Sequence, residues 1–221
     1  LANLVPFLAA SRAAATWDIR ALGLNHPSAR PMTIYASAET HTWIHKAADI
    51  SGLGTDAIRW IETDAALRMK MTALRDAVER DRRDGMLPMI VVGTAGSVST
   101  GAIDPLPELA EFCRERGIWF HVDGAYGALA AAATGAPAEL RAMALADSVA
   151  VDPHKWLYAP LEAGCALVRD ASALRDAFSY HPPYYHFGQE AVNLVDFGLQ
   201  NSRGFRALKV WLQLQHAGSD G

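Results

Sequence analysis

Pro88-Met-Ile-Val-Val-Gly93 is a continuous apolar run in the middle of the chain. A run of this kind is typical of a strand that is buried on both faces, as in a parallel sheet covered by helices. The flanking residues support this interpretation. A charged helix predicted over residues 72–83 ends at Gly85, and a second helix is predicted over residues 105–116. The run therefore predicts a buried strand of an α/β fold.

Strands and helices are predicted to alternate along the rest of the chain. The other predicted strands cover residues 32–36, 57–61, 118–122, 148–151 and 165–168. The other predicted helices cover residues 1–21, 42–52, 171–178 and 205–216. No internal repeat or linker divides this pattern, so it predicts one α/β domain whose mostly parallel sheet is flanked by helices. In such sheets, ligands bind at the carboxyl ends of the strands.

The composition excludes several classes of protein. The 221 residues include 51% hydrophobic residues, which excludes intrinsic disorder as the main state. The net charge of -4 is spread over charges of both signs, so neither a nucleic acid nor a membrane surface is an expected partner. No apolar run approaches the roughly 20 residues of a membrane-spanning helix. The two cysteines, Cys113 and Cys165, favour a reducing, cytoplasmic location, and the scattered histidines lack the spacing of metal ligands.

The segment Val151-Asp-Pro-His-Lys-Trp156 places a histidine and a lysine directly after a predicted strand. The amine of a lysine can form a Schiff base with an aldehyde cofactor or a carbonyl substrate. Burial supplies the neutral, nucleophilic amine that this reaction requires. A solvated lysine in a surface loop explains the same pattern, because most lysines lie in water.

The segment Phe120-His-Val-Asp-Gly-Ala-Tyr126 ends another predicted strand with an aspartate. A carboxylate at this place is costly unless it has a cationic partner. The protonated pyridine nitrogen of pyridoxal phosphate (PLP) would be such a partner, and the small residues Gly124 and Ala125 would let a flat ring approach the backbone. An aspartate that caps a following helix accounts equally well for Asp123.

Two further segments carry polar residues after predicted strands. His41 precedes a predicted helix, and an imidazole there can stack on a flat ring or transfer a proton, although a lone histidine is more often a capping residue. Gly93-Thr-Ala-Gly-Ser-Val-Ser-Thr-Gly-Ala-Ile-Asp104 has the glycines and hydroxyls of a loop that holds a phosphate or a ring hydroxyl. Ordinary strand-to-helix loops share this composition, and the segment matches neither the P-loop nor the dinucleotide fingerprint.

The order and spacing of these segments resemble the group II PLP-dependent decarboxylases, a family that includes aromatic-L-amino-acid, histidine and glutamate decarboxylases. The resemblance rests on His41, the Ser97–Thr100–Gly101–Asp104 loop, His121-Val-Asp-Gly-Ala-Tyr126 and Asp152-Pro-His-Lys-Trp156, and it covers nearly the whole chain. It implies the large domain of a PLP-dependent transferase-like (fold type I) enzyme. Residues 1–221 would be the central part of that domain, with the N-terminal segment and the small C-terminal domain outside this chain. It also implies a homodimer, a PLP cofactor and an amino acid substrate.

The resemblance implies roles for individual residues. Lys155 would form the Schiff base, Asp123 would pair with the pyridine nitrogen, and His154 would contact the phosphate. His41 and Ala125 would lie on opposite faces of the cofactor ring, and Ser97 would make a polar contact with the cofactor.

The proton returned to the substrate carbon would come from Tyr184 or His41. Tyr184 lies in Phe178-Ser-Tyr-His-Pro-Pro-Tyr-Tyr185, which resembles the mobile catalytic loop of the family. Family members with phenylalanine at this place tend toward oxidative aldehyde formation, so Tyr184 favours simple decarboxylation. An aromatic-proline loop that only covers an apolar surface is the alternative explanation of this segment.

The chain departs from the family pattern at four positions. Ser97 and Val98 stand where a threonine and, in some members, a second hydroxyl are found, so one polar contact is expected to be absent. Asp152 replaces an asparagine, and its negative charge would be unfavourable beside a phosphate unless it points away. Gly204 replaces an arginine, which puts an ion pair in doubt.

The function expected from the resemblance is decarboxylation of an L-amino acid to an amine and carbon dioxide. An aromatic substrate is favoured, and an acidic substrate such as glutamate is the alternative. A cysteine desulfurase-like lyase would also place a histidine on the ring and a His-Lys pair at the Schiff base. A non-catalytic fragment of a decarboxylase is the third possibility, because a phosphate-holding segment of the family precedes the region that matches Leu1.

Overall fold

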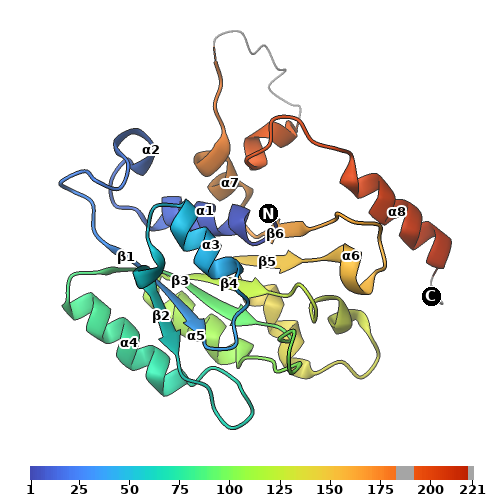
Figure 1. The fold of residues 1–221 in the computed structure, drawn as a ribbon, viewed down its shortest axis with the longest axis horizontal. Helices are drawn as coiled ribbons and strands as arrows, with labels where there is room; N and C mark the ends of the chain where they lie inside the picture. The colour runs from blue at the N-terminus through green and yellow to red at the C-terminus, as the bar shows by residue number, and fades with distance from the viewer. Residues whose placement is uncertain (183–191, 219–221) are drawn as a thin grey trace.

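The computed structural model describes residues 1–182 and 192–218, and its centre is a six-stranded sheet between two layers of helices (Figure 1). The strands stand in the order β2-β1-β3-β4-β5-β6. The first five are parallel, and only β6 pairs antiparallel, with β5. Their bounds are β1 Met32–Ser37, β2 Ile58–Ile61, β3 Leu87–Thr94, β4 Trp119–Asp123, β5 Ser148–Val151 and β6 Cys165–Val168. This confirms the predicted α/β fold with a mostly parallel sheet.

The helices cover both faces of the sheet. Helices α1 and α3 pack on one face, and α4 and α5 pack on the other. Helix α7 lies against α1, whereas α8 has no buried residue and extends away from the sheet (Figure 1). The helical bounds are α1 Leu4–Ala14, α2 Ile19–Leu22, α3 Trp43–Ile50, α4 Met71–Arg83, α5 Leu106–Arg116, α6 Pro153–Trp156, α7 Ala171–Phe178 and α8 Arg206–Ala217.

The apolar run in β3 is buried on both faces, as predicted. Val91 packs in the core beneath α4 and α5, while Ile90 and Val92 pack in the core beneath α1 and α3. Gly93 lies against Leu106 of α5, and an added Cβ there would come within 3.0 Å of that side chain. The carboxyl end of β3 therefore lies close against α5.

Strand β4 divides its side chains between the two faces. Phe120 and Val122 belong to the core beneath α4 and α5, and His121 is buried on the opposite face. The Nδ1 atom of His121 lies 2.8 Å from Ser148 Oγ, and its Nε2 atom lies 2.9 Å from Asn3 Oδ1. Burial lowers the pKa of His121 to about 3, so this ring is neutral near pH 7. It joins the start of α1 to β4 and β5.

The predicted helix over residues 1–21 is wrong in one respect, because the chain forms two helices there. Ala15 adopts an extended conformation after α1, and the side chain of Asp18 accepts a hydrogen bond from the amide of Ala21, which starts α2. The 3-10 helices over Leu129–Ala132 and Ala138–Leu145 and the short helix α6 were not predicted either. Among the described residues, no helix combines the length and the apolar character that a membrane crossing needs.

Asp104 fixes the loop that follows β3. Its Oδ2 atom accepts a hydrogen bond of 2.8 Å from the amide of Thr94, and its Oδ1 atom accepts one of 2.7 Å from the amide of Met69. The side chain is only 2% exposed. Burial raises the pKa of Asp104 from its ordinary value of 3.8 to about 6, and the hydrogen bonds to the two amides only partly oppose this effect.

Asp104 should therefore make the stability of the protein depend on pH between about 4 and 6. In this window the folded chain holds a proton on Asp104 that the unfolded chain has released, so the free energy of unfolding should fall as the pH rises, by up to about 3 kcal/mol. Denaturant unfolding at a series of pH values measures this loss. Asp104→Asn cannot titrate, so the variant should be less stable overall but should lack this part of the slope. An identical slope in both proteins would contradict the assignment.

Candidate functional site

Three neighbouring strands end side by side at one edge of the sheet. In the parallel register, Thr94 of β3 pairs with Asp123 of β4, and Asp123 pairs with Ala150 of β5. The segments that follow these strands carry most of the residues predicted to bind a cofactor. The fold therefore brings the predicted segments to the carboxyl edge, where α/β proteins bind ligands.

Asp123 is 7% exposed and has partners on both carboxylate oxygens. Its Oδ1 atom accepts a hydrogen bond of 3.1 Å from the amide of Ala125. Its Oδ2 atom accepts one of 2.7 Å from the indole Nε1 of Trp43. Asp123 therefore caps the turn at Ala125. It does not cap a helix, as the alternative interpretation required, because no α-helix begins there. Trp43 was missed, since nothing in the sequence links it to a residue 80 positions away.

The glycines after Asp123 are explained by packing within the protein. A Cβ atom on Gly124 would lie 2.5 Å from the Cβ of Ala128 and 3.1 Å from the carbonyl oxygen of Ala150. A Cβ atom on Gly127 would lie 2.2 Å from the carbonyl oxygen of Ala95. The idea that Gly124 makes room for a flat ring is therefore unnecessary, and Ala125 remains the predicted ring contact.

Lys155 lies in α6 and is not a freely solvated lysine. Its Nζ atom forms an ion pair of 2.9 Å with Asp152 Oδ2. The same atom lies 4.2 Å from the ring centroid of Tyr126, in the turn that follows Asp123. The side chain is 27% exposed, so the amine can still be reached. Tyr126 thus links the segment that carries Asp123 to the segment that carries Lys155.

His154 is held by the segment that leads into β6. Its Nδ1 atom lies 2.7 Å from the carbonyl oxygen of Ala163. Its Nε2 atom lies 3.9 Å from Asp152 Oδ2. The carboxylate of Asp152 therefore faces both basic side chains of the Pro-His-Lys segment. Its negative charge is compensated locally, chiefly by the amine of Lys155.

The end of β3 and the loop after it contain two buried hydroxyls, of which one is paired and one is not. Ser97 is buried, and its Oγ atom lies 2.8 Å from Thr100 Oγ1. Thr94 Oγ1 is buried and has no hydrogen-bond partner among the described residues. Val98 is 56% exposed, so an apolar side chain faces solvent where some family members have a hydroxyl.

His41 and Tyr184 are placed differently from the other predicted site residues. The His41 side chain is exposed, and its Nδ1 atom accepts a hydrogen bond of 3.2 Å from the amide of Trp43, so it caps the start of α3. Tyr184 lies outside the described residues. A Cβ atom on Gly204 would have no neighbour within 4 Å among the described residues, and a nearby arginine, Arg206, forms an ion pair with Glu162.

These residues fit a PLP-like cofactor. Asp123 supplies a carboxylate for a ring nitrogen, Lys155 supplies an amine, and Thr94 leaves a buried hydroxyl unsatisfied beside Asp123. The described residues contain no group of three or more His, Cys, Asp or Glu side chains that could hold a metal ion.

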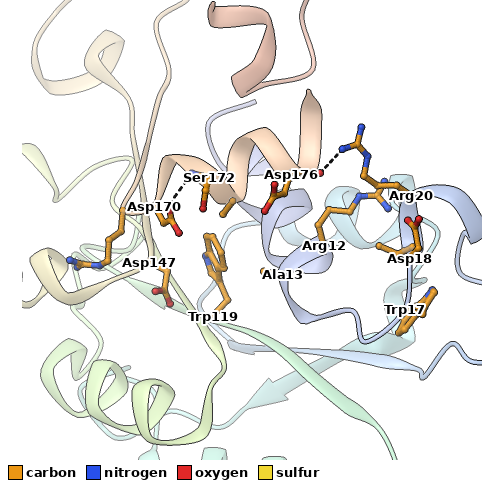
Figure 2. Close-up of a pocket in the computed structure, with 13 residues that line it drawn as sticks. Arg12, Ala13, Trp17, Asp18, Arg20, Trp119, Asp147, Asp170, Ser172 and Asp176 are labelled. Atoms are coloured by element: carbon orange, nitrogen blue, oxygen red, sulfur yellow. Dashed lines mark hydrogen bonds between the residues drawn. The ribbon is translucent and has the colours of Figure 1, made fainter. Parts of the chain in front are cut away.

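A cavity of about 440 Å³ lies elsewhere, among α1, α2 and α7 (Figure 2). Trp119 and Asp147 line it at the amino-terminal ends of β4 and β5, on the edge opposite Asp123. Two hydrogen bonds join residues that line it: Asp170 accepts from the amide of Ser172, and Arg20 donates to the carbonyl oxygen of Asp176 (Figure 2).

Comparison with known proteins agrees with this geometry. The family model described as "Pyridoxal-dependent decarboxylase conserved domain" matches residues 1–221. An aromatic-L-amino-acid decarboxylase of Bacillus atrophaeus is 38% identical over 186 residues, which are 82% of this chain and 39% of that protein. The crystal structure of mouse CSAD has a TM-score of 0.89 and 32% identity, over 98% of this chain and 45% of that one. The structure of Oryza sativa TDC with PLP and tryptamine has a TM-score of 0.86 and 30% identity, over 98% and 45%.

The chain spans less than half the length of each of these relatives. The match to the family model nevertheless extends over every residue of the chain. The chain therefore belongs to the pyridoxal-dependent decarboxylase family.

Proposed function

We propose that the protein carrying this chain is a PLP-dependent carboxy-lyase that converts an L-amino acid to an amine and carbon dioxide. One observation carries the proposal: the ends of β4 and β5 bring the carboxylate of Asp123 and the amine of Lys155 to one edge, joined by Tyr126. When bound, PLP supplies the electron sink that stabilises a carbanion at the substrate carbon.

The side chains of this chain would bind and orient the cofactor. Asp123 would accept the N–H of the ring nitrogen and so hold a proton on it, which maintains the positive charge that withdraws electrons. Lys155 would hold the aldehyde group of the cofactor through its Nζ amine. Ser97 and His154 would hold polar groups of the cofactor. Ala125 and His41 would contact its two faces.

Lys155 gives the first test of the proposal. In the complete enzyme, Lys155→Ala should abolish the absorbance band of the lysine-bound cofactor near neutral pH, because the variant lacks the amine that would bind the cofactor. Release of carbon dioxide should fall by roughly 10³-fold or more, in line with the loss of a covalent catalyst. Lys46→Ala is the control, since Lys46 is exposed on α3 and should leave the band unchanged. A band that persists in Lys155→Ala would rule out the assignment.

The same experiment separates the proposal from a non-catalytic fragment. A complete protein that forms the band but releases no carbon dioxide from any amino acid would be a binding protein only. Family membership does not favour the cysteine desulfurase alternative, and release of carbon dioxide rather than sulfur would exclude it.

We propose an aromatic amino acid as the substrate, with an acidic amino acid as the alternative. The support is the likeness to the Bacillus atrophaeus decarboxylase and to the rice structure with tryptamine. Carbon dioxide release should be measured with tryptophan, tyrosine, histidine, glutamate and aspartate. The value of kcat/KM for tryptophan or tyrosine should exceed that for glutamate by at least about 10²-fold, because burial of an unpaired side-chain charge is costly. A preference for glutamate or aspartate would overturn the aromatic assignment.

We further propose Tyr184 as the acid that returns a proton to the substrate carbon, with His41 as the other candidate. Tyr184→Phe should lower amine formation by about 10²-fold, the usual contribution of a general acid, and should leave the absorbance of the bound cofactor unchanged. Aldehyde should be assayed beside the amine, because phenylalanine at this place accompanies aldehyde formation in the family. Unchanged amine formation would transfer the role to His41.

The remaining expectations are proposals about the whole protein. Residues 1–221 would be the central part of the PLP-binding large domain, and further segments would complete the substrate pocket. The active form would be a cytoplasmic homodimer that binds neither nucleic acid nor membranes, in keeping with the mixed charges and the two free cysteines.

A further inference from the structure

The hydrogen bond between Trp43 and Asp123 joins a residue without an assigned role to the centre of the candidate site. The indole Nε1 of Trp43 lies 2.7 Å from Asp123 Oδ2. This distance is at the short end for an N–H donor, which is typical of bonds to an ionised acceptor. Asp123 is the only partner of this indole nitrogen among the described residues.

Packing explains where the Trp43 ring lies but not where its N–H points. The ring meets Phe7 of α1 edge to face, with centroids 6.2 Å apart and an interplanar angle of 86°. It meets His121 in the same way, at 5.7 Å and 82°. A phenylalanine could make both contacts. The indole nitrogen adds the bond to the carboxylate, and it reaches Asp123 from the side of α1 and α3.

The donors on Asp123 leave acceptor capacity for a further partner. Each carboxylate oxygen has two lone pairs, and each is used once, by Trp43 on Oδ2 and by the amide of Ala125 on Oδ1. Two donors from different segments fix both the plane and the rotation of the carboxylate. The remaining lone pairs are available to a group that approaches the open edge of the sheet.

We propose that Trp43 is a positioning residue that fixes the carboxylate of Asp123 for a bond to the ring nitrogen of the cofactor. This inference rests on the proposed function, because it requires that Asp123 pairs with a pyridine nitrogen. In this role Trp43 would act through Asp123 and not by contact with the cofactor or the substrate. Its effect on the cofactor therefore depends on the ring nitrogen and on no other cofactor group.

The test uses the complete enzyme and two cofactors: PLP, and its deaza analogue in which carbon replaces the ring nitrogen. Trp43→Phe keeps an aromatic ring between Phe7 and His121 and removes the N–H. The variant should bind PLP about tenfold more weakly than the wild type, the usual effect of losing a hydrogen bond to a charged group. It should bind the deaza analogue as well as the wild type does. Trp60→Phe is the matched control, because Trp60 is 42% exposed on β2, and it should change neither affinity.

The ratio of the two affinities separates positioning from packing. If Trp43→Phe lowers the affinity for both cofactors equally, Trp43 acts only through packing and the proposal is wrong. If it weakens neither, Asp123 does not need this donor and the proposal is equally wrong. If the wild type fails to bind PLP, or Lys155→Ala keeps its absorbance band, the proposed function fails first, and this is visible before Trp43 is changed.

A measurement on the wild type covers the case in which Trp43→Phe does not fold. With ¹⁵N-labelled tryptophan, the indole N–H resonance that Asp123→Asn displaces is assigned to Trp43. This resonance should shift more on addition of PLP than on addition of the deaza analogue, because only PLP brings a second N–H to the same carboxylate. Equal shifts would overturn the proposal.

Discussion

The amide of Gly127 donates a hydrogen bond of 2.9 Å to the carbonyl oxygen of Ala95, and no side chain fits between these two backbones. This close approach holds the loop after β3 against the turn after β4. Because the turn is fixed at Gly127, the residues on either side of it are fixed as well. Asp123 is held at its beginning, and Tyr126 is held where it meets the amine of Lys155. Together with the bond from the amide of Ala95 to the carbonyl oxygen of Asp123, this backbone contact holds the end of β4 and its turn beside the loop after β3.

Sequence patterns predicted the sheet well because each strand carries its own signal. The apolar run of β3 and the short strands β5 and β6 are marked by residues within the strand itself. Motif spacing likewise located Asp123 and Lys155. The break between α1 and α2 was missed because an alanine-rich segment is compatible with a continuous helix, and the cap that divides it belongs to Asp18. Trp43 as the partner of Asp123 and Tyr126 as the neighbour of Lys155 were missed for another reason: a contact between distant segments leaves no periodic pattern in one sequence.

The neighbours of Asp152 explain how the chain accommodates a carboxylate where the family pattern has an asparagine. Considered alone, an added carboxylate near a phosphate is unfavourable. In the structure its Oδ2 atom lies 2.9 Å from the amine of Lys155 and 3.9 Å from the ring of His154. An asparagine there could accept a hydrogen bond from the amine but could not neutralise its charge. Lys155 therefore has its counter-ion, Asp152, only three residues earlier in the same segment.

The bond between Asn3 and His121 has a consequence for the order of events during synthesis. The two residues are 118 positions apart, and His121 also binds Ser148 further along the chain. On the ribosome, α1 emerges long before β4. Asn3 therefore has no hydrogen-bond partner until His121 has been translated. The edge that carries Asp123 and Lys155 can form only after β5 has been translated. A chain released early, before β5, would lack both the Ser148 partner of His121 and the contacts between α1 and α7, and would become a target for chaperones and proteases.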